Sequence, residues 1–113
     1  AHTAEGAAAI QRLSRKLHGW TLEVVAPGGR GSFPVVFFVT GMAGNVPISG
    51  YSDLLSRIAA RGFVNVALHH TRFPDYPPMG NDFLAVLEWA RAGSLSAWMR
   101  AGGLAAGPDV LRR

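Results

Sequence analysis

The chain lacks cysteine, long apolar runs and an ordinary share of acidic residues. With no cysteine among its 113 residues, it can form no disulfide, thiolate metal site or cysteine nucleophile, and its redox compartment is left open. No apolar run approaches the roughly 20 residues of a membrane-spanning helix. The hydrophobic content of 49% and the mean hydropathy of +0.17 still exclude disorder and predict one packed domain or part of one.

The scarcity of acids also explains the basic character of the chain. Asp and Glu total 7 against 11 Lys and Arg, which gives a net charge of +4 at pH 7 and a pI of about 10.7. Nucleic-acid-binding domains carry a clustered basic stripe, commonly with interleaved aromatic residues. The only cluster here is RLSRK, Arg12 to Lys16, and it contains no aromatic residue. We therefore predict no nucleic-acid partner.

The N-terminal stretch allows two interpretations. The chain begins with Ala1, which indicates a processed, truncated or incompletely assigned product. Residues 1–19 are alanine-rich and basic, which suits the remnant of an organellar leader, from a chloroplast or mitochondrial protein. The same composition suits an amphipathic helix. Ile10, Leu13 and Leu17 recur at helical spacing, so the helix is the favoured prediction.

Residues 20–113 are predicted to form an α/β unit. Trp20–Ala26 alternates apolar and polar residues, as a half-buried strand does, and a turn rich in glycine and proline follows. Val35–Thr40 is continuously apolar, which is typical of a parallel strand buried on both faces. A helix over 52–61 and a strand over Phe63–Leu68 then complete a βαβ unit.

The predicted helices have recognisable ends. Ser52 is the candidate N-cap of the first, and Gly62 supplies its C′ position. A second helix is capped by Asn81 or Asp82, and Gly93 ends or bends it. About two further helical turns follow, and then an extended C-terminal segment. The apolar spacing of both helices predicts these inward residues: Leu54, Leu55, Ile58, Ala59, Phe83, Val86, Leu87 and Ala90.

The loop that follows Thr40 suggests two kinds of site. The segment VTGMAG, residues 39–44, resembles the strand-end glycine motif of short-chain dehydrogenases, whose glycines let backbone amides approach a pyrophosphate. Pro47 and Ser49 stand where a third glycine is needed, and no acid follows the second strand to bind a ribose hydroxyl. Arg72 would instead favour a 2′-phosphate. An NADP-binding reductase-type domain is therefore one alternative.

A second resemblance covers residues 20 to 113 in one register. It is to the α/β-hydrolase superfamily, and within it to the chlorophyllase-like esterases. That family has a short strand, a Gly/Pro turn, a buried strand ending in His-Gly, and then a helix of the type YS-LL--IA--GF. AVLEWARAG and GPDVLRR resemble the family's next helix and the segment before its nucleophile strand. The matching positions of the first helix are Tyr51, Ser52, Leu54, Leu55, Ile58, Ala59, Gly62 and Phe63.

The resemblance implies a fold and a partial site. The expected fold is α/β and three-layered, a partial α/β-hydrolase-like and mostly parallel sheet with flanking helices. Gly41 permits the turn after the strand, and the backbone N–H of Met42 helps to hold a tetrahedral oxyanion. Thr40 stands where the family has histidine. A backbone donor does not require that histidine.

The chain has no G-x-S-x-G, the nucleophile elbow of this superfamily. Acyl transfer needs a nucleophile, a base and a group that orients the base. We therefore assign no catalytic residue, no metal site and no cofactor. The favoured hypothesis is a non-catalytic, hydrolase-derived subunit or half-domain in a larger assembly. The other hydrolase hypothesis is a fragment of an active serine ester hydrolase whose nucleophile lies beyond residue 113.

His69 and His70 are further candidates for ligand binding. They follow the Phe63–Leu68 strand at its carboxyl end, the edge where open α/β sheets bind ligands. Adjacent residues on an extended segment point in opposite directions, so the pair is poorly placed to share one metal. One half-buried and one solvated histidine is the favoured interpretation, and ligation of a pigment or metal is the alternative. Contact with pigment or lipid is left open.

The hydrolase topology also predicts a partner. In it, Val35–Thr40 lies between the Phe63 strand and the nucleophile strand, which this chain lacks. The free side would expose unpaired N–H and C=O groups, and Val35 to Val39 contains no charge or proline to protect it. We expect another polypeptide, or a missing C-terminal half, to cover the Val35–Thr40 strand edge.

The nucleotide hypothesis is tested by titration. Because the third glycine and the ribose acid are missing, we expect no saturable NAD(P)H binding at micromolar concentration, where binding requires about −8 kcal/mol. Fluorescence titration of the chain with NADPH checks this. Micromolar binding that is lost on Gly41→Val would establish the reductase alternative.

Overall fold

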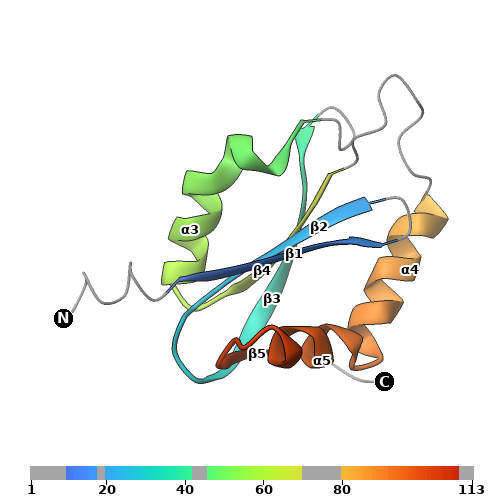
Figure 1. Cartoon of the computed structure of the whole chain (residues 1–113). Coiled ribbons are helices and arrows are strands. Elements are labelled where there is room, and N and C mark those ends of the chain that lie inside the picture. The colour runs from blue at the N-terminus through green and yellow to red at the C-terminus, as the bar shows by residue number, and fades with distance from the viewer. Residues whose placement is uncertain (1–9, 18–19, 42–45, 70–79, 110–113) are drawn as a thin grey trace.

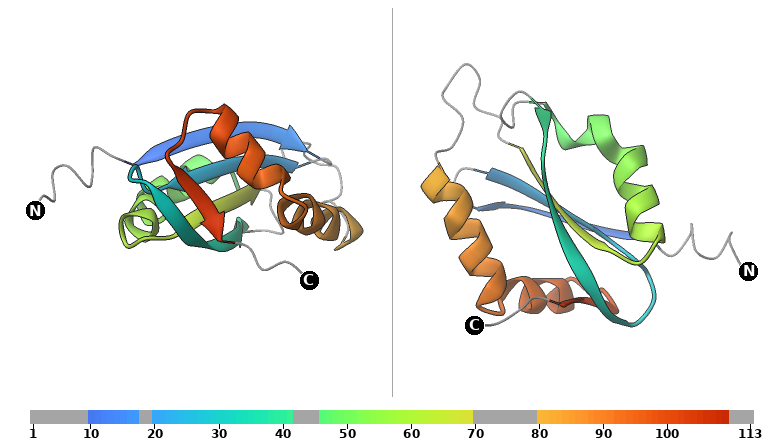
Figure 2. Two further views of the ribbon diagram at one scale, coloured as in Figure 1. Left: turned by 90° about the horizontal axis from the view of Figure 1, so that it is seen from below. Right: turned by 180° about the vertical axis from the view of Figure 1, so that it is seen from behind.

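The protein is an α/β structure in three layers. The computed structural model describes residues 10–17, 20–41, 46–69 and 80–109. One twisted five-stranded sheet runs through the middle, with one helix on one face and two helices on the other (Figures 1 and 2). The strands are β1 (Gln11–Leu17), β2 (Trp20–Ala26), β3 (Gly31–Val39), β4 (Val64–His69) and β5 (Ala106–Asp109). The helices are η1 (Ile48–Tyr51, a 3-10 turn), α3 (Ser52–Ala60), α4 (Gly80–Arg91) and α5 (Ser94–Ala101).

The sheet is mixed, so the prediction of a mostly parallel sheet is wrong. The strand order is β1-β2-β4-β3-β5. β1 pairs with β2, and β2 with β4, in antiparallel fashion, whereas β3 is parallel to both β4 and β5. The short connections give the reason. Only a hairpin can join β1 to β2 directly, while the α3 crossover makes β3 and β4 parallel, as the βαβ prediction required.

The helix predicted from Ile10, Leu13 and Leu17 is also wrong. Gln11–Leu17 is β1, and it pairs with β2 along its whole length. Positions i and i+4 share a face in a strand as well as in a helix, so Leu13 and Leu17 fit both. Ile10 decides between them: it packs on the α3 face of the sheet, whereas Leu17 packs on the opposite face. The residues preceding Ile10 lie outside the described part of the chain.

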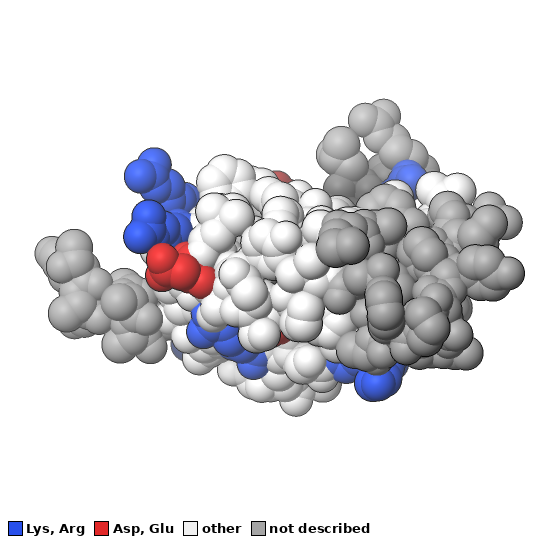
Figure 3. Space-filling model, turned by 90° about the horizontal axis from the view of Figure 1, so that it is seen from above, with Lys and Arg blue, Asp and Glu red and all other residues white. Residues whose placement is uncertain are grey.

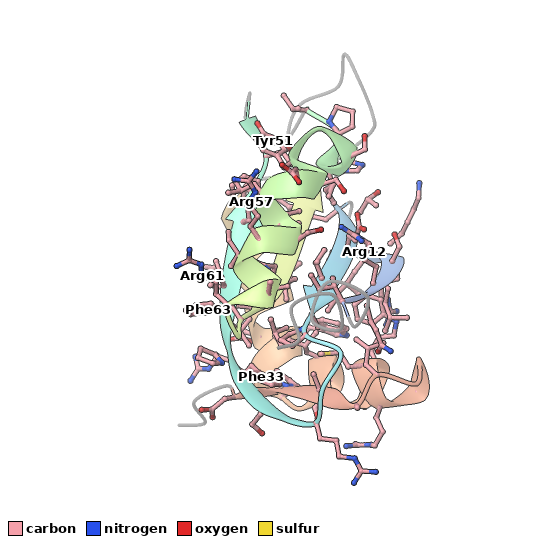
Figure 4. The ribbon with its side chains drawn as sticks, turned by 90° about the vertical axis from the view of Figure 1, so that its left-hand side faces the viewer. Arg12, Phe33, Tyr51, Arg57, Arg61 and Phe63 are labelled. Atoms are coloured by element: carbon pink, nitrogen blue, oxygen red, sulfur yellow. The ribbon has the colours of Figure 1, made fainter. Side chains whose placement is uncertain are left out.

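The side chains of β1 confirm this alternation. Arg12 faces α3, where it donates hydrogen bonds to Ser52 and Ser56 and forms an ion pair with Glu23 of β2. Figure 4 shows Arg12 on the side of α3 away from β3. Arg15 lies three residues after Arg12, so its side chain points to the opposite face of the sheet, toward α4 and α5.

Two apolar cores lie on the two faces of the sheet. Side chains of β4 alternate between them: Val64, Val66 and Leu68 pack against α4 and α5, and Ala67 packs against α3. Every residue from Val64 to Leu68 is fully buried. The larger core also contains Trp20, Leu22, Val24, Ala26, Val86, Ala90, Leu95, Met99 and Ala106, and the smaller one Val25, Ile48, Leu55 and Ala59.

Strand β3 is less buried than its apolar sequence predicts. Val35 to Phe38 are half-buried, and Val39 is 39% exposed. The cause is the neighbour on its far side, because β5 pairs only with Gly31–Pro34. Among the described residues, none pairs with Val35–Val39 on the side opposite β4. β5 itself falls in the predicted extended C-terminal segment.

The helix ends agree in part with prediction. Gly62 follows the C-cap of α3 with φ of 97°, a left-handed conformation that favours glycine, as predicted. Tyr51, not Ser52, is the N-cap, because η1 runs directly into α3. Leu55 and Ala59 are buried as predicted, but Leu54 is 46% exposed.

Helices α4 and α5 cover the face of the sheet opposite α3. Gly93, with φ of 97°, separates α4 from α5 as predicted. The Arg15 guanidinium lies over Trp89 at 5.5 Å and Trp98 at 5.7 Å, in a cation–π arrangement that joins β1 to both helices. Val86 and Ala90 are buried as predicted. The side chains of Asn81, Asp82 and Phe83 lie outside the described part of the structure.

One buried amide ties the sheet to α3. Asn65, in the middle of β4, is fully buried, and its Nδ2 donates to the carbonyls of Val25 in β2 and Leu55 in α3, at 3.3 and 3.2 Å. Within the described part of the chain, its Oδ1 accepts no hydrogen bond. Two donated bonds therefore stabilise the position of α3 on the sheet.

Asn65 provides a test of this packing. Asn65→Asp loses both donated bonds and leaves an unpaired buried charge, so we expect a loss of about 3–5 kcal/mol in the free energy of unfolding. Asn65→Val loses the same bonds without the charge and should cost only about 1–2 kcal/mol. Urea unfolding followed by tryptophan fluorescence measures both. Equal losses would show that residue 65 is hydrated rather than buried.

Candidate functional site

The candidate site lies where β3 and β4 end side by side. The N–H of Thr40 donates to the carbonyl of Leu68 at 3.2 Å, so the parallel pairing continues one residue beyond β3. Since Val39 pairs with Leu68, the same register places Thr40 beside His69. Side chains opposite each other in a sheet share a face, and here that face is the one covered by η1 and α3. Ligands of open α/β sheets bind at this edge.

Gly41 uses both of its backbone polar groups. Its N–H donates to the Tyr51 Oη at 3.1 Å, and its carbonyl accepts from the Val46 N–H at 3.3 Å. The two bonds fix the start of the glycine loop, residues 41–47, which connects β3 to η1. The Gly41 amide is therefore already satisfied inside the protein, and an oxyanion would need a donor further along the chain.

Close packing explains why glycine occupies this position. A Cβ added to Gly41 would lie 2.9 Å from the Tyr51 Oη and 3.6 Å from the Val46 Cγ2. The first distance is shorter than real Cβ contacts allow. Gly41 is not among the glycines with positive φ. The approach of the tyrosine hydroxyl, rather than a left-handed backbone, therefore requires glycine here.

Tyr51 is the residue that sequence analysis undervalued. It matched the family pattern at the start of a helix, but no role followed from that match. In the structure it is half-buried and packs edge-on against Phe38, with ring centroids 4.9 Å apart and an interplanar angle of 68°. Figure 4 shows it at the end of α3 that lies nearest the end of β3. A tyrosine ten residues after a strand-end glycine was the available signal.

His69 anchors the other end of the loop. Its Nδ1 accepts a hydrogen bond from the Ile48 N–H at 2.8 Å, and its side chain is half-buried. This bond holds η1 against the end of β4, and the imidazole must be unprotonated at Nδ1 to accept it. His69 cannot use Nδ1 to bind a metal or pigment while the bond is present. His70 and Met42, the other predicted site residues, lie outside the described residues.

Thr40 is buried at the centre of the site. It is 2% exposed, and none of the described residues forms a hydrogen bond with its Oγ1. An unsatisfied buried hydroxyl costs about 1–3 kcal/mol. Thr40 therefore adds little stability through its hydroxyl, although it stands where the resembling family has histidine.

The described charges form no obvious ligand site. Within residues 10–17, 20–41, 46–69 and 84–109, no three His, Asp or Glu side chains gather as metal ligands would. On the face seen in Figure 3, basic side chains are scattered among uncharged surface and form no continuous stripe. No helix in the described part is long and apolar enough to cross a membrane.

Comparisons with known proteins show similarity of fold alone. No protein-family model and no curated protein matches the chain. Among solved structures, it is similar to a brefeldin A esterase described as a bacterial homologue of human hormone-sensitive lipase. The TM-score is 0.58 at 20% identity, over 75% of this chain and 28% of that one.

Two further esterase structures are similar. An esterase of the bacterial hormone-sensitive lipase family gives a TM-score of 0.57 at 20% identity, over 85% of this chain and 40% of that one. A double mutant of another esterase gives 0.57 at 19% identity, over 90% and 45%. The chain thus spans less than half the length of each protein. Together they show that this chain has a partial α/β-hydrolase-like fold.

Proposed function

We propose that this chain is a half-domain of an ester hydrolase, non-catalytic by itself, which supplies the glycine loop and is completed along β3 by a further strand. The open edge of β3 is the observation that carries the proposal. Strand β5 covers Gly31–Pro34, and the described residues leave Val35–Val39 uncovered on that side. The similar proteins, all named as esterases, are about two to three times as long.

The backbone N–H groups of β3 point alternately to β4 and to the open side. The Thr40 N–H points to β4, because it donates to Leu68. Backbone groups alternate along a strand, so the Phe38 N–H also points to β4, whereas those of Phe37 and Val39 point to the open side. These open donors sit beside bulky apolar side chains with no charge or proline among them. Natural proteins rarely leave such an edge unpaired.

The register of β5 specifies the strand that completes the edge. Gly31 pairs with Ala106, and Pro34 with Asp109, in parallel. A strand that extends β5 in the same register and direction would satisfy Phe37 and Val39. It would come from another polypeptide or from a further segment of the same chain. Residues facing the two cores would be apolar, because Phe37 and Phe38 lie on opposite faces of β3.

The chemistry assigned to the loop is stabilisation of an ester oxyanion. Backbone N–H groups that follow a strand end and are held in place are worth about 2.7–4 kcal/mol each in the transition state of acyl transfer. Met42 remains the proposed donor, because the Gly41 N–H is bonded to Tyr51. A chlorophyllase-like substrate, a pigment or lipid contact and an organellar location remain proposals that rest on the sequence resemblance alone.

The absence of a nucleophile elbow leads to a first test. We expect the purified chain to turn over no p-nitrophenyl ester and to show no serine labelling by a fluorophosphonate, because no G-x-S-x-G is present. Mass spectrometry of the treated chain checks the labelling. Stoichiometric modification of one of its own serines would overturn the non-catalytic assignment.

The β3 edge leads to a second test, by residue-resolved hydrogen exchange. In the chain alone, the Phe37 and Val39 amides should exchange at least tenfold faster than that of Phe38, a difference of about 1.4 kcal/mol. Phe38 serves as the internal control, because it faces β4 in every state. Sedimentation should show association rather than a stable monomer. A cooperative monomer in which Phe37 is as protected as Phe38 would contradict the missing strand.

A further inference from the structure

The hydrogen bond between Gly41 and Tyr51 suggests a function for a side chain that no motif assigns. We infer that Tyr51 is a positioning residue: its hydroxyl sets the point at which the glycine loop leaves β3. The inference rests on the proposed function for its consequence in catalysis, but its geometry stands on its own. Tyr51 Oη accepts the Gly41 N–H at 3.1 Å across ten residues of chain.

Tyr51 is itself held from two sides. Its ring packs edge-on against Phe38, which belongs to the smaller core between the sheet and α3. Its backbone belongs to η1, whose first residue, Ile48, donates its N–H to His69 at the end of β4. The tyrosine hydroxyl is thus a fixed acceptor, attached to β4 through η1 and to β3 through Phe38. It fixes Gly41 relative to both strands.

Gly41 and Tyr51 require each other sterically. The Cβ of an alanine at position 41 would lie 2.9 Å from the Tyr51 Oη, the same atom that accepts the Gly41 N–H. Alanine would displace the hydroxyl and break the bond. If the hydroxyl is removed first, the nearest atom that alanine meets among the described residues is the Val46 Cγ2 at 3.6 Å, an ordinary contact. The two substitutions should therefore not add.

The consequence for the proposed reaction concerns the turnover step. Both backbone groups of Gly41 are bonded within the protein, so Tyr51 affects an oxyanion only through the position of the residues that follow. A misplaced oxyanion donor weakens transition-state binding more than substrate binding. Loss of the Tyr51 hydroxyl in a completed domain should lower kcat and leave KM nearly unchanged.

The test is a double-mutant cycle on the full chain, in whatever assembly it forms, with residue-resolved hydrogen exchange. Tyr51→Phe keeps the ring against Phe38 and removes the acceptor, so the Gly41 amide should exchange about tenfold faster, equivalent to about 1.4 kcal/mol. The Ile48 amide, held by His69, should change less than about twofold. The second readout is exchange of the Val46 amide, which donates to the Gly41 carbonyl.

Gly41→Ala should strongly accelerate hydrogen exchange of the Val46 amide in the wild-type background. In the Tyr51→Phe background, the same substitution should have little additional effect on that amide. Gly50→Ala is the matched control, because the nearest described atom to a Cβ at Gly50 is the Val46 Cγ1, in ordinary contact at 3.8 Å. It should leave the Gly41 amide unchanged. Unchanged Gly41 exchange in Tyr51→Phe, or a full additional effect of alanine in that background, would overturn the inference.

The result of this double-mutant cycle can be distinguished from a failure of the proposed function. If the exchange cycle behaves as expected and a domain completed along β3 hydrolyses p-nitrophenyl esters, Tyr51→Phe should lower kcat about tenfold or more, with KM within about twofold. If the cycle behaves as expected but no completed form hydrolyses esters, the proposed function fails and the positioning of Gly41 by Tyr51 stands. A loss confined to KM would contradict the catalytic consequence.

Discussion

The burial of β4 is the constraint on which the other elements depend. Its residues from Val64 to Leu68 are all fully buried, with a neighbouring strand on each side and a helical layer on each face. Apolar side chains on one face contact α4 and α5, and Asn65 and Ala67 on the other contact α3. Its final residue, His69, reaches η1. The candidate site is an extension of this packing at the carboxyl end of the strand.

The site consists of backbone positions fixed by side chains, rather than of reactive side chains. Gly41 is held by Tyr51 of η1, and Ile48, the residue after the glycine loop, is held by His69 at the end of β4. Both backbone groups of Gly41 and the N–H of Ile48 are thus already bonded within the protein. The described residues of the site include no serine of a G-x-S-x-G elbow.

The sequence predicted the parts of the fold that local signals determine. The strand over Phe63–Leu68, the βαβ order, and the helix ends at Gly62 and Gly93 followed from residue type and spacing. Strand β1 did not, because the four-residue spacing of Leu13 and Leu17 satisfies a helix and a strand equally. Its pairing with β2 and the packing of Ile10 and Leu17 on opposite faces of the sheet separate the two. The mixed sheet was missed for the same reason, since strand direction depends on neighbours far apart in sequence.

The site was less predictable than the fold. Gly41 was found from its place at a strand end, but the reason for glycine there is the hydroxyl of Tyr51, a contact that no local pattern encodes. His69 was found as a candidate ligand, and its bond to Ile48 gives it a structural contact that the sequence did not suggest. Both contacts arise only after η1 has folded back onto the end of the sheet.

The pairing of β3 with β5 has a consequence for the order of folding. It joins Gly31 to Ala106, 75 residues further along the chain, whereas β1 and β2 form a local hairpin. Closing a long loop costs entropy before its contacts repay it, so such pairings form late. A ribosome also completes β3 well before β5 emerges. Newly made β3 therefore spends time with its β5 side bare, and a bare strand edge is a template for pairing with other extended chains.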